Sequence, residues 1–140
     1  MAAAAEAGVY MQAERKVILC LCYDTNMLQV RQMLLEHFGY VVVPTSSVEA
    51  AGKIAEKQCP DMLLIDNGHP DVDFEKLAAQ IKRRCPNVIA VVLSPFYYSG
   101  RNGNGMIDRF VAKDDGPAVL ISQIEELFHE RGRGNDRPVN

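Results

Sequence analysis

The sequence lacks long apolar runs, and this limits what kind of protein it can be. A membrane-spanning helix needs about 20 consecutive apolar residues, and no window of the 140 residues approaches that length. Residues 1–14 contain an alanine run but no positively charged start before it, so they do not resemble a secretion signal. We therefore expect a chain that is neither secreted nor inserted in a membrane.

Positive charge is also scarce. The chain has 15 lysine and arginine residues against 18 aspartate and glutamate residues, a formal net charge of -3. Domains that bind nucleic acid usually carry a basic patch, so direct binding of nucleic acid is not expected. A composition of 48% hydrophobic and 24% charged residues is that of an ordinary globular domain. The length suits one domain rather than two.

The four cysteines do not form a recognisable metal or redox motif. They are Cys20, Cys22, Cys59 and Cys85, and no pair has the C-x-x-C spacing. Cys20 and Cys22 lie two residues apart in an apolar run, so they would share one face of a strand. We therefore expect buried free thiols in a reducing compartment, the cytoplasm.

Apolar segments alternate between strand-like and helix-like patterns through the chain. Strands are predicted at residues 17–22, 41–43, 61–66, 88–93 and about 110–112, with helices between them. This alternation predicts an α/β fold: a flavodoxin-like doubly wound sandwich whose five-stranded parallel sheet has the order 2-1-3-4-5 and helices on both faces. The domain would span residues 15–130, between flexible extensions at residues 1–14 and 131–140.

Three local patterns give more detailed expectations. Met27, Val30, Leu34 and Phe38 recur at helical spacing and predict the apolar face of the first helix, and Gly39 is expected to end this helix as its C-terminal cap. Ser46, followed three residues later by a glutamate, predicts a capping box at the start of the next helix. The segment 94–105, SPFYYSGRNGNG, is too rich in glycine and asparagine for a regular helix, so the fourth helix should be shortened or irregular.

Polar residues follow the predicted strands at one edge of the sheet. They are Asp24, Asp66, Ser94 and Lys113. The carboxyl ends of parallel strands form the usual ligand crevice of this fold class. A carboxylate, a hydroxyl and an ammonium group gathered there could carry a phosphoryl group on Asp66, with Mg²⁺ as the usual partner of such chemistry.

The segment Pro60–Pro70, PDMLLIDNGHP, resembles strand three of the receiver domain of bacterial two-component response regulators, the CheY-like family. The resemblance spans residues 16–130 and implies that Asp66 is the phosphoacceptor. Ser94, which ends IAVVL, matches the family's switch serine or threonine, and Lys113 in RFVAK matches its lysine. Phe110 matches the aromatic switch position.

The resemblance breaks down at the first strand. Cys22 and Tyr23 stand where the family usually has two adjacent acidic residues, and Asp24 is displaced by one position. We therefore expect a degenerate receiver with weak Mg²⁺ binding, through Asp66, the Gly68 carbonyl and Asp24 by way of water.

Two functions follow from the resemblance. In the first, a histidine kinase or phosphotransfer protein phosphorylates Asp66, and the switch residues change the protein's preference for a downstream partner. In the second, the chain is a phosphorylation-independent pseudo-receiver that acts as a protein-interaction module. In neither case is it a turnover enzyme.

The expected partner surfaces lie around the last two strands. Tyr97 and Tyr98 would contact a partner or simply pack over the sheet edge, and the face formed by strands four and five could pair two copies of the chain. The ten residues after residue 130 are too few for an output domain, so we expect the effect to pass through a partner or through a larger protein of which this chain is a part. Two weaker alternatives are a transition-metal site made by His69, Asp66 and Asp24, and a flavodoxin-like cofactor site, which the turn after the first strand does not favour.

Overall fold

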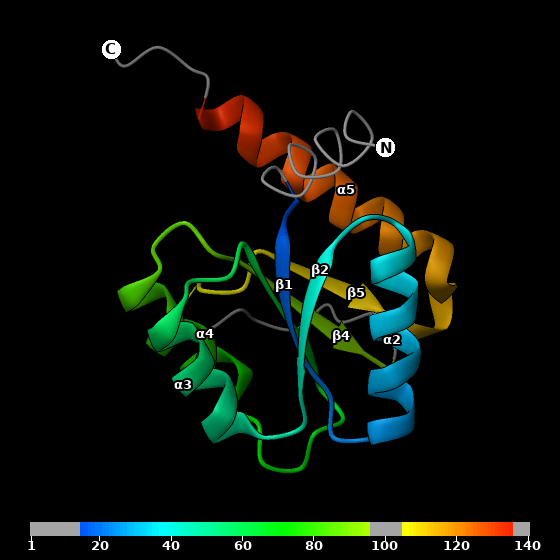
Figure 1. Ribbon diagram of the computed structural model, residues 1–140, viewed down its shortest axis with the longest axis horizontal. Coiled ribbons are helices and arrows are strands. Elements are labelled where there is room, and N and C mark those ends of the chain that lie inside the picture. Colours follow the sequence, from blue (N-terminus) through cyan, green and yellow to red (C-terminus); the bar gives the residue numbers. More distant parts are fainter. Residues whose placement is uncertain (1–14, 96–104, 136–140) are drawn as a thin grey trace, which may run out of the picture.

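Five strands alternate with helices along the chain (Figure 1). The computed structural model describes residues 15–95 and 105–135, with side chains up to residue 132. The strands are β1 (Val17–Leu21), β2 (Val41–Thr45), β3 (Met62–Asp66), β4 (Ile89–Ser94) and β5 (Arg109–Ala112). The helices are α2 (Thr25–His37), α3 (Val48–Lys57), α4 (Phe74–Arg84) and α5 (Gly116–Asn135), with a short 3₁₀ turn, η1 (Lys113–Asp115), before α5.

The five strands form one parallel sheet with the order β2-β1-β3-β4-β5. This confirms the predicted fold class and strand order. In the register of the sheet Asp66 lies beside Leu93, and Ser94 lies beside Ala112. The carboxyl ends of β3, β4 and β5 therefore meet at one edge.

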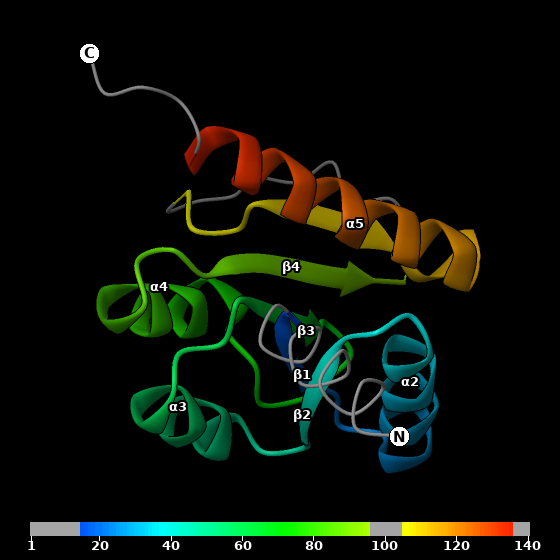
Figure 2. The same ribbon diagram turned by 45° about the horizontal axis from the view of Figure 1, so that its top comes forward.

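Helices cover both faces of the sheet. Figures 1 and 2 show α2 and α5 on one face, and α3 and α4 on the other. Side chains alternate along β1, so that Ile18 and Cys20 pack toward α2 and α5, whereas Leu19 and Leu21 pack toward α3 and α4. Strands β3 and β4 are buried along their whole length, as expected for a sheet covered on both sides.

The apolar face predicted for the first helix is wrong at three of its four residues. Met27, Val30 and Phe38 are exposed, and only Leu34 packs, half-buried, against the core. The buried residues of α2 are Leu28, Arg31 and Leu35. Residues 28, 31 and 35 also follow the helical repeat, so spacing alone could not choose between the two rows. The observed rotation places the single arginine of this row over the sheet.

Two cap predictions have different outcomes. The cap of α3 is Ser47 rather than Ser46, because the Ser47 hydroxyl accepts a hydrogen bond from Ala50 N at 3.1 Å. Gly39 follows α2 with a φ of +95°, a conformation that side chains with a Cβ rarely adopt. The glycine stop predicted for this helix is confirmed.

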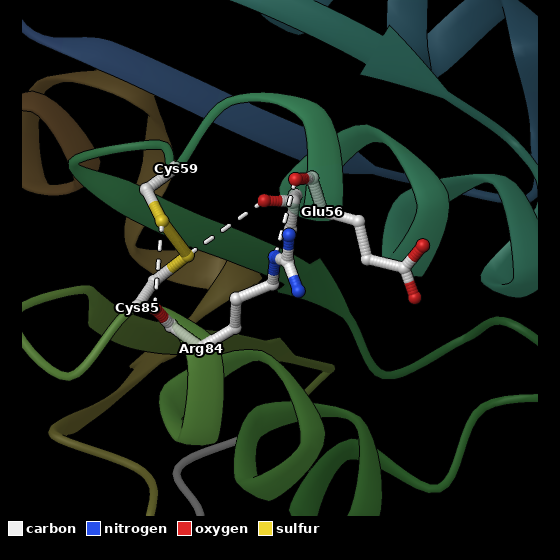
Figure 3. Close-up of a disulfide and its surroundings, with 5 residues drawn as sticks. Glu56, Cys59, Arg84 and Cys85 are labelled. Atoms are coloured by element: carbon white, nitrogen blue, oxygen red, sulfur yellow. Dashed lines mark hydrogen bonds between the residues drawn. A yellow bond between two sulfur atoms is a disulfide. The ribbon is translucent and has the colours of Figure 1, made fainter.

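The prediction of four free thiols is half correct. Cys20 and Cys22 are free and buried, but Cys59 and Cys85 form a disulfide (Figure 3). The two residues are 26 positions apart in the sequence, and the packing of α3 against α4 brings their Cα atoms to 5.6 Å. No local pattern encodes this tertiary proximity, so the sequence could not predict the pair.

The C-terminal end of the last helix also differs from expectation. Helix α5 continues to Asn135, past the predicted boundary at Glu130. Arg131 stabilises this extension, because its guanidinium donates to Asn87 O at 2.8 Å. Between β4 and β5 the described residues, 95 and 105–108, are not helical, and residues 96–104 lie outside the described ranges. Within the described ranges, no helix combines the length and apolar character needed to cross a bilayer.

Candidate functional site

Asp66 lies at the centre of the predicted site, at the carboxyl end of β3. It is only 4% exposed, and both of its carboxylate oxygens have partners. Oδ1 contacts the Lys113 ammonium group and accepts a hydrogen bond from Gly68 N at 2.7 Å. Oδ2 accepts a hydrogen bond from Arg31 Nη1 at 2.6 Å. The structure thus brings Asp66 and Lys113 together, as the sequence predicted.

Arg31 is the residue that the sequence analysis missed. It lies in the middle of α2, is 8% exposed, and its guanidinium points to the end of β3. The same Nη1 atom is 3.3 Å from Cys22 Sγ, and Cys22 Sγ is 3.4 Å from Asp66 Oδ2. The available signal was a basic residue between Leu28 and Leu35 on a helical row, in a chain that also lacks acidic residues at positions 22 and 23.

Gly68 allows the loop after β3 to approach Asp66 closely. A Cβ atom at this position would lie 3.0 Å from Asp66 Oδ1 and 3.3 Å from Lys113 Nζ. The amide of Gly68 is directed at the carboxylate, in the geometry of a short turn after an aspartate. This backbone contact therefore needs a residue without a side chain.

The surroundings of Asp66 favour its ionised form. Burial raises the pKa of the carboxyl group, but the hydrogen bonds from Lys113, Arg31 and the Gly68 amide outweigh burial, so that the net pKa lies below its ordinary value of 3.8. Asp66 is therefore a carboxylate held between two cations. A carboxylate in this state is a weak nucleophile, because its charge is already compensated.

The two free thiols beside the site remain protonated. Burial raises the pKa of Cys20 to about 12. Burial, followed by the negative charge of Asp66, also raises the pKa of Cys22. Because the thiolate is the reactive form, neither group is a candidate nucleophile.

Asp24 has a structural partner that the sequence analysis did not consider. Its carboxylate is the N-cap of α2, and Oδ1 accepts hydrogen bonds from Asn26 N at 2.9 Å and Met27 N at 3.1 Å. Asp24 still lines the same cavity of about 230 Å³ as Arg31 and Asp66. The orientation of its carboxylate follows from the strong preference of aspartate for N-cap positions.

Tyr23 and His69 form the rim of the site. The two rings are in edge-to-face contact, with centroids 5.2 Å apart. His69 Nε2 lies 2.7 Å from Ser46 O, and Nδ1 accepts a hydrogen bond from Asp71 N at 3.1 Å, so the ring is held as the Nε2–H tautomer. The bond to Ser46 ties the loop after β3 to the loop after β2. They also direct the ring nitrogens away from the transition-metal site considered above.

The predicted switch residues lie on β4 and β5. Ser94 is 1% exposed at the end of β4, and Phe110 packs edge-to-face on Phe74 with ring centroids 5.7 Å apart. Both positions fit the predicted roles, which stay predictions. Tyr97 and Tyr98, the predicted partner contacts, lie outside the described residues.

The donor set beside Asp66 does not fit Mg²⁺. This ion requires several oxygen ligands in near-octahedral geometry, whereas the Arg31 guanidinium occupies one Asp66 oxygen, Lys113 the other, and a neutral thiol, Cys22, completes the group. Nowhere in the described part of the chain do three histidine, cysteine, aspartate or glutamate residues gather as a metal site. The positive charge at this edge of the sheet therefore comes from side chains.

The comparisons with known proteins agree with the geometry of the fold. No protein-family model and no curated protein sequence matches the chain. Solved structures do match. A CheY-like response regulator receiver domain protein from Methanospirillum hungatei has a TM-score of 0.77 and 23% identity, over 86% of this chain and 98% of that one.

Two further structures are similar. The response regulator TrrA from Thermotoga maritima, solved in complex with Mg²⁺-BeF, has a TM-score of 0.71 and 20% identity, over 80% of this chain and 98% of that one. The chemotaxis protein CheY4 from Vibrio cholerae has a TM-score of 0.72 and 14% identity, over 80% and 98%. The chain therefore has the fold of the CheY-like response regulator receiver domains, with an arginine-bound aspartate at the end of β3.

Proposed function

We propose that this chain is a pseudo-receiver: a receiver-fold signalling module that acts by binding partner proteins, without Mg²⁺-dependent phosphorylation of Asp66. The observation that carries the proposal is the 2.6 Å contact between Arg31 Nη1 and Asp66 Oδ2, made by two side chains that are 10% and 6% exposed. In this arrangement a cation from the chain itself fills the position beside Asp66.

The chemistry of acyl phosphate formation supports this proposal. A phosphoryl group is transferred when a carboxylate oxygen attacks phosphorus, and positive charge must neutralise the phosphoryl oxygens. Here the attacking oxygen would have to leave its partner: Oδ2 would leave Arg31, or Oδ1 would leave Lys113 and the Gly68 amide. Separating a buried ion pair is costly because the freed charges are not solvated.

The surface of α2 supports a role in protein binding. Large apolar side chains are exposed along this helix and beside it; they are Tyr23, Met27, Val30, Met33 and Phe38. Exposed apolar patches of this kind commonly mark protein interaction sites. Pairing of two copies through the β4–β5 face stays a prediction, as does the cytoplasmic location.

The second candidate is the phosphoacceptor switch. Two observations favour it: Lys113 contacts Asp66, and Ser94 ends the strand beside β3. In this case a histidine kinase or phosphotransfer protein would supply the phosphoryl group, and no further turnover activity is expected.

Intact-mass measurement separates the two candidates. The protein is incubated with a small phosphodonor, phosphoramidate or acetyl phosphate, with and without Mg²⁺, and Asp66→Asn serves as the control. We expect no mass gain in the wild-type protein. A labile gain of about 80 Da, the mass of a phosphoryl group, that needs Mg²⁺ and disappears in Asp66→Asn would establish the switch instead.

A double variant tests whether Arg31 prevents Mg²⁺ from binding beside Asp66. Replacing Cys22 with aspartate and Arg31 with alanine puts a second carboxylate beside Asp66 and removes the neighbouring guanidinium. Two adjacent carboxylates favour a bound divalent cation. We expect Mg²⁺ to raise the melting temperature of Cys22→Asp/Arg31→Ala and to leave that of the wild type unchanged.

A further inference from the structure

We propose that Cys59 and Cys85 form a thiol–disulfide site that opens and closes in the folded protein, in exchange with a dithiol reductant. The disulfide joins the carboxyl ends of α3 and α4, on the face of the sheet opposite to α2 (Figures 2 and 3). This inference does not depend on the state of Asp66, which lies at the other end of β3. The redox state of the disulfide would be a signal to which the protein responds without phosphorylation.

The two cysteines of the disulfide differ in exposure. Cys59 follows α3 and is exposed, whereas Cys85 is the C-cap of α4 and is 3% exposed. A reductant can therefore approach only Cys59, and the buried sulfur becomes the leaving group. The reductant therefore attacks one particular sulfur, and the first product is a mixed disulfide between the reductant and Cys59.

The surroundings can accommodate the reduced state. Each sulfur has a backbone carbonyl oxygen nearby: Arg84 O is 3.8 Å from Cys59 Sγ, and Ala55 O is 3.8 Å from Cys85 Sγ (Figure 3). After reduction each new thiol can donate a weak hydrogen bond to its carbonyl. Reduction would therefore leave no buried polar group without a partner at this point.

The contact between α3 and α4 does not rely on the disulfide alone. Arg84 Nε donates to Glu56 O at 3.1 Å, and Ala51, Ala55 and Ala78 pack in the apolar layer between the helices and the sheet. The Gln80 side chain of α4 also reaches α3, since its Nε2 atom lies 2.8 Å from where a Cβ of Gly52 would be. We therefore expect both redox states to be folded, as a reversible site requires.

The remaining cysteines cannot replace either member of the pair. Cys20 and Cys22 belong to the apolar layer on the side of α2 and α5, and both are at most 2% exposed. The sheet separates them from Cys59 and Cys85. They serve as internal controls for any thiol measurement.

The exchange is balanced by the dithiol. One thiolate of the reductant attacks Cys59 Sγ, the bond to Cys85 breaks, and Cys85 takes up a proton. The second thiol of the reductant then attacks the mixed disulfide, releases Cys59 as a thiol and leaves the reductant as a disulfide. Oxidation follows the reverse path, with a disulfide of the same class as oxidant.

The consequence of opening lies in α4. The disulfide fixes the C-cap residue of this helix, and Phe74 at its first turn packs on Phe110 of β5. Helix α4 is thus a rigid link between the cysteine pair and the β5 side of the sheet. Reduction releases one end of this link and is expected to increase local opening of α4, where the Cys85 amide donates to Ile81 O at 2.7 Å.

The proposal is tested by counting thiols in the full-length protein. The protein is equilibrated in oxidised dithiothreitol, or in reduced dithiothreitol without denaturant, then quenched, denatured, alkylated with iodoacetamide and weighed. We expect two labels after oxidation and four after native reduction, with an unchanged far-UV circular dichroism spectrum. Four labels after oxidation would overturn the proposal. So would a second pair of labels that appears only when reduction is carried out in urea.

A variant separates the effect of the bond from other effects of the reductant. Reduction should raise the unfolding equilibrium constant of the wild type by on the order of 100-fold, because the bond closes a 26-residue loop. Cys59→Ser cannot form the bond, so the reductant should leave its unfolding curve and its Cys85 amide exchange unchanged. An equal response of wild type and Cys59→Ser would contradict the assignment.

Discussion

Replacement of Arg31 by methionine should destabilise the protein strongly. Methionine keeps the apolar stem of the side chain and removes the guanidinium, so Asp66 Oδ2 loses its 2.6 Å partner. Removal of one member of a buried ion pair typically costs about 3–5 kcal/mol. Lys113 and the Gly68 amide still contact Oδ1, so we expect the lower end of this range, about 3 kcal/mol.

The assay is urea unfolding at pH 7, followed by circular dichroism, together with a thermal melt. A loss of about 3 kcal/mol corresponds to a fall of about 10 °C in melting temperature for a domain of this size. Lys53→Met is the matched control, because Lys53 also pairs with a carboxylate, Glu49, but the two side chains are 69% and 78% exposed. Its expected cost is less than about 1 kcal/mol.

The double variant Arg31→Met/Asp66→Asn completes the experiment. Since it removes both charges, it should be more stable than the sum of the two single losses predicts, by about 1 kcal/mol or more. Additive losses, or an Arg31→Met protein as stable as Lys53→Met, would refute the claim that Arg31 and Asp66 form a buried pair.

Three further predictions follow from individual residues. The pKa of Asp66 is lowered in the fold, so the ionised carboxylate stabilises the protein above the ordinary pKa of 3.8, and this stabilisation is lost as the pH falls through the folded pKa. The difference in unfolding free energy between wild type and Asp66→Asn should therefore shrink in acid. A difference that stays constant between pH 7 and pH ~3 would contradict this prediction. Asp24→Ala should lower the free energy of unfolding in urea by about 1 kcal/mol, because α2 loses its N-cap, and Asp24→Asn should lower it by less. Equal losses in the two variants would contradict the capping role of Asp24. Cys20, whose pKa is raised to about 12 by burial, should resist iodoacetamide at pH ~8 in the native state, and rapid native labelling would show that it is accessible.

The sequence predicted the sheet because its signals are local. Continuous apolar runs mark β1, β3 and β4, and helices alternate with them, so the strand order follows from general rules for parallel sheets. The meeting of Asp66 and Lys113 also follows, because both residues end or follow a strand at the same edge. Neither the strand order nor the meeting of Asp66 and Lys113 depends on which face of a helix is buried.

The missed features depend on tertiary packing. Two rows of α2, one containing Met27 and Val30 and the other Leu28 and Arg31, satisfy the same helical repeat, and the buried row contains the charged residue. Burial of an arginine is unfavourable unless a carboxylate meets it, and that carboxylate lies 35 residues away in the sequence. The disulfide has the same origin, since only the packing of α3 on α4 brings its cysteines together.

The central claim is that Arg31 fills the cation position beside Asp66, and titration with Mn²⁺ followed by amide NMR tests it most directly. Mn²⁺ prefers the same oxygen ligands as Mg²⁺, and its paramagnetism broadens signals of nearby amides. In the wild-type protein the Gly68 amide, which donates to Asp66 Oδ1, should stay sharp at millimolar Mn²⁺, whereas in Cys22→Asp/Arg31→Ala it should broaden. Selective broadening of Gly68 in the wild type at submillimolar Mn²⁺ would contradict the account.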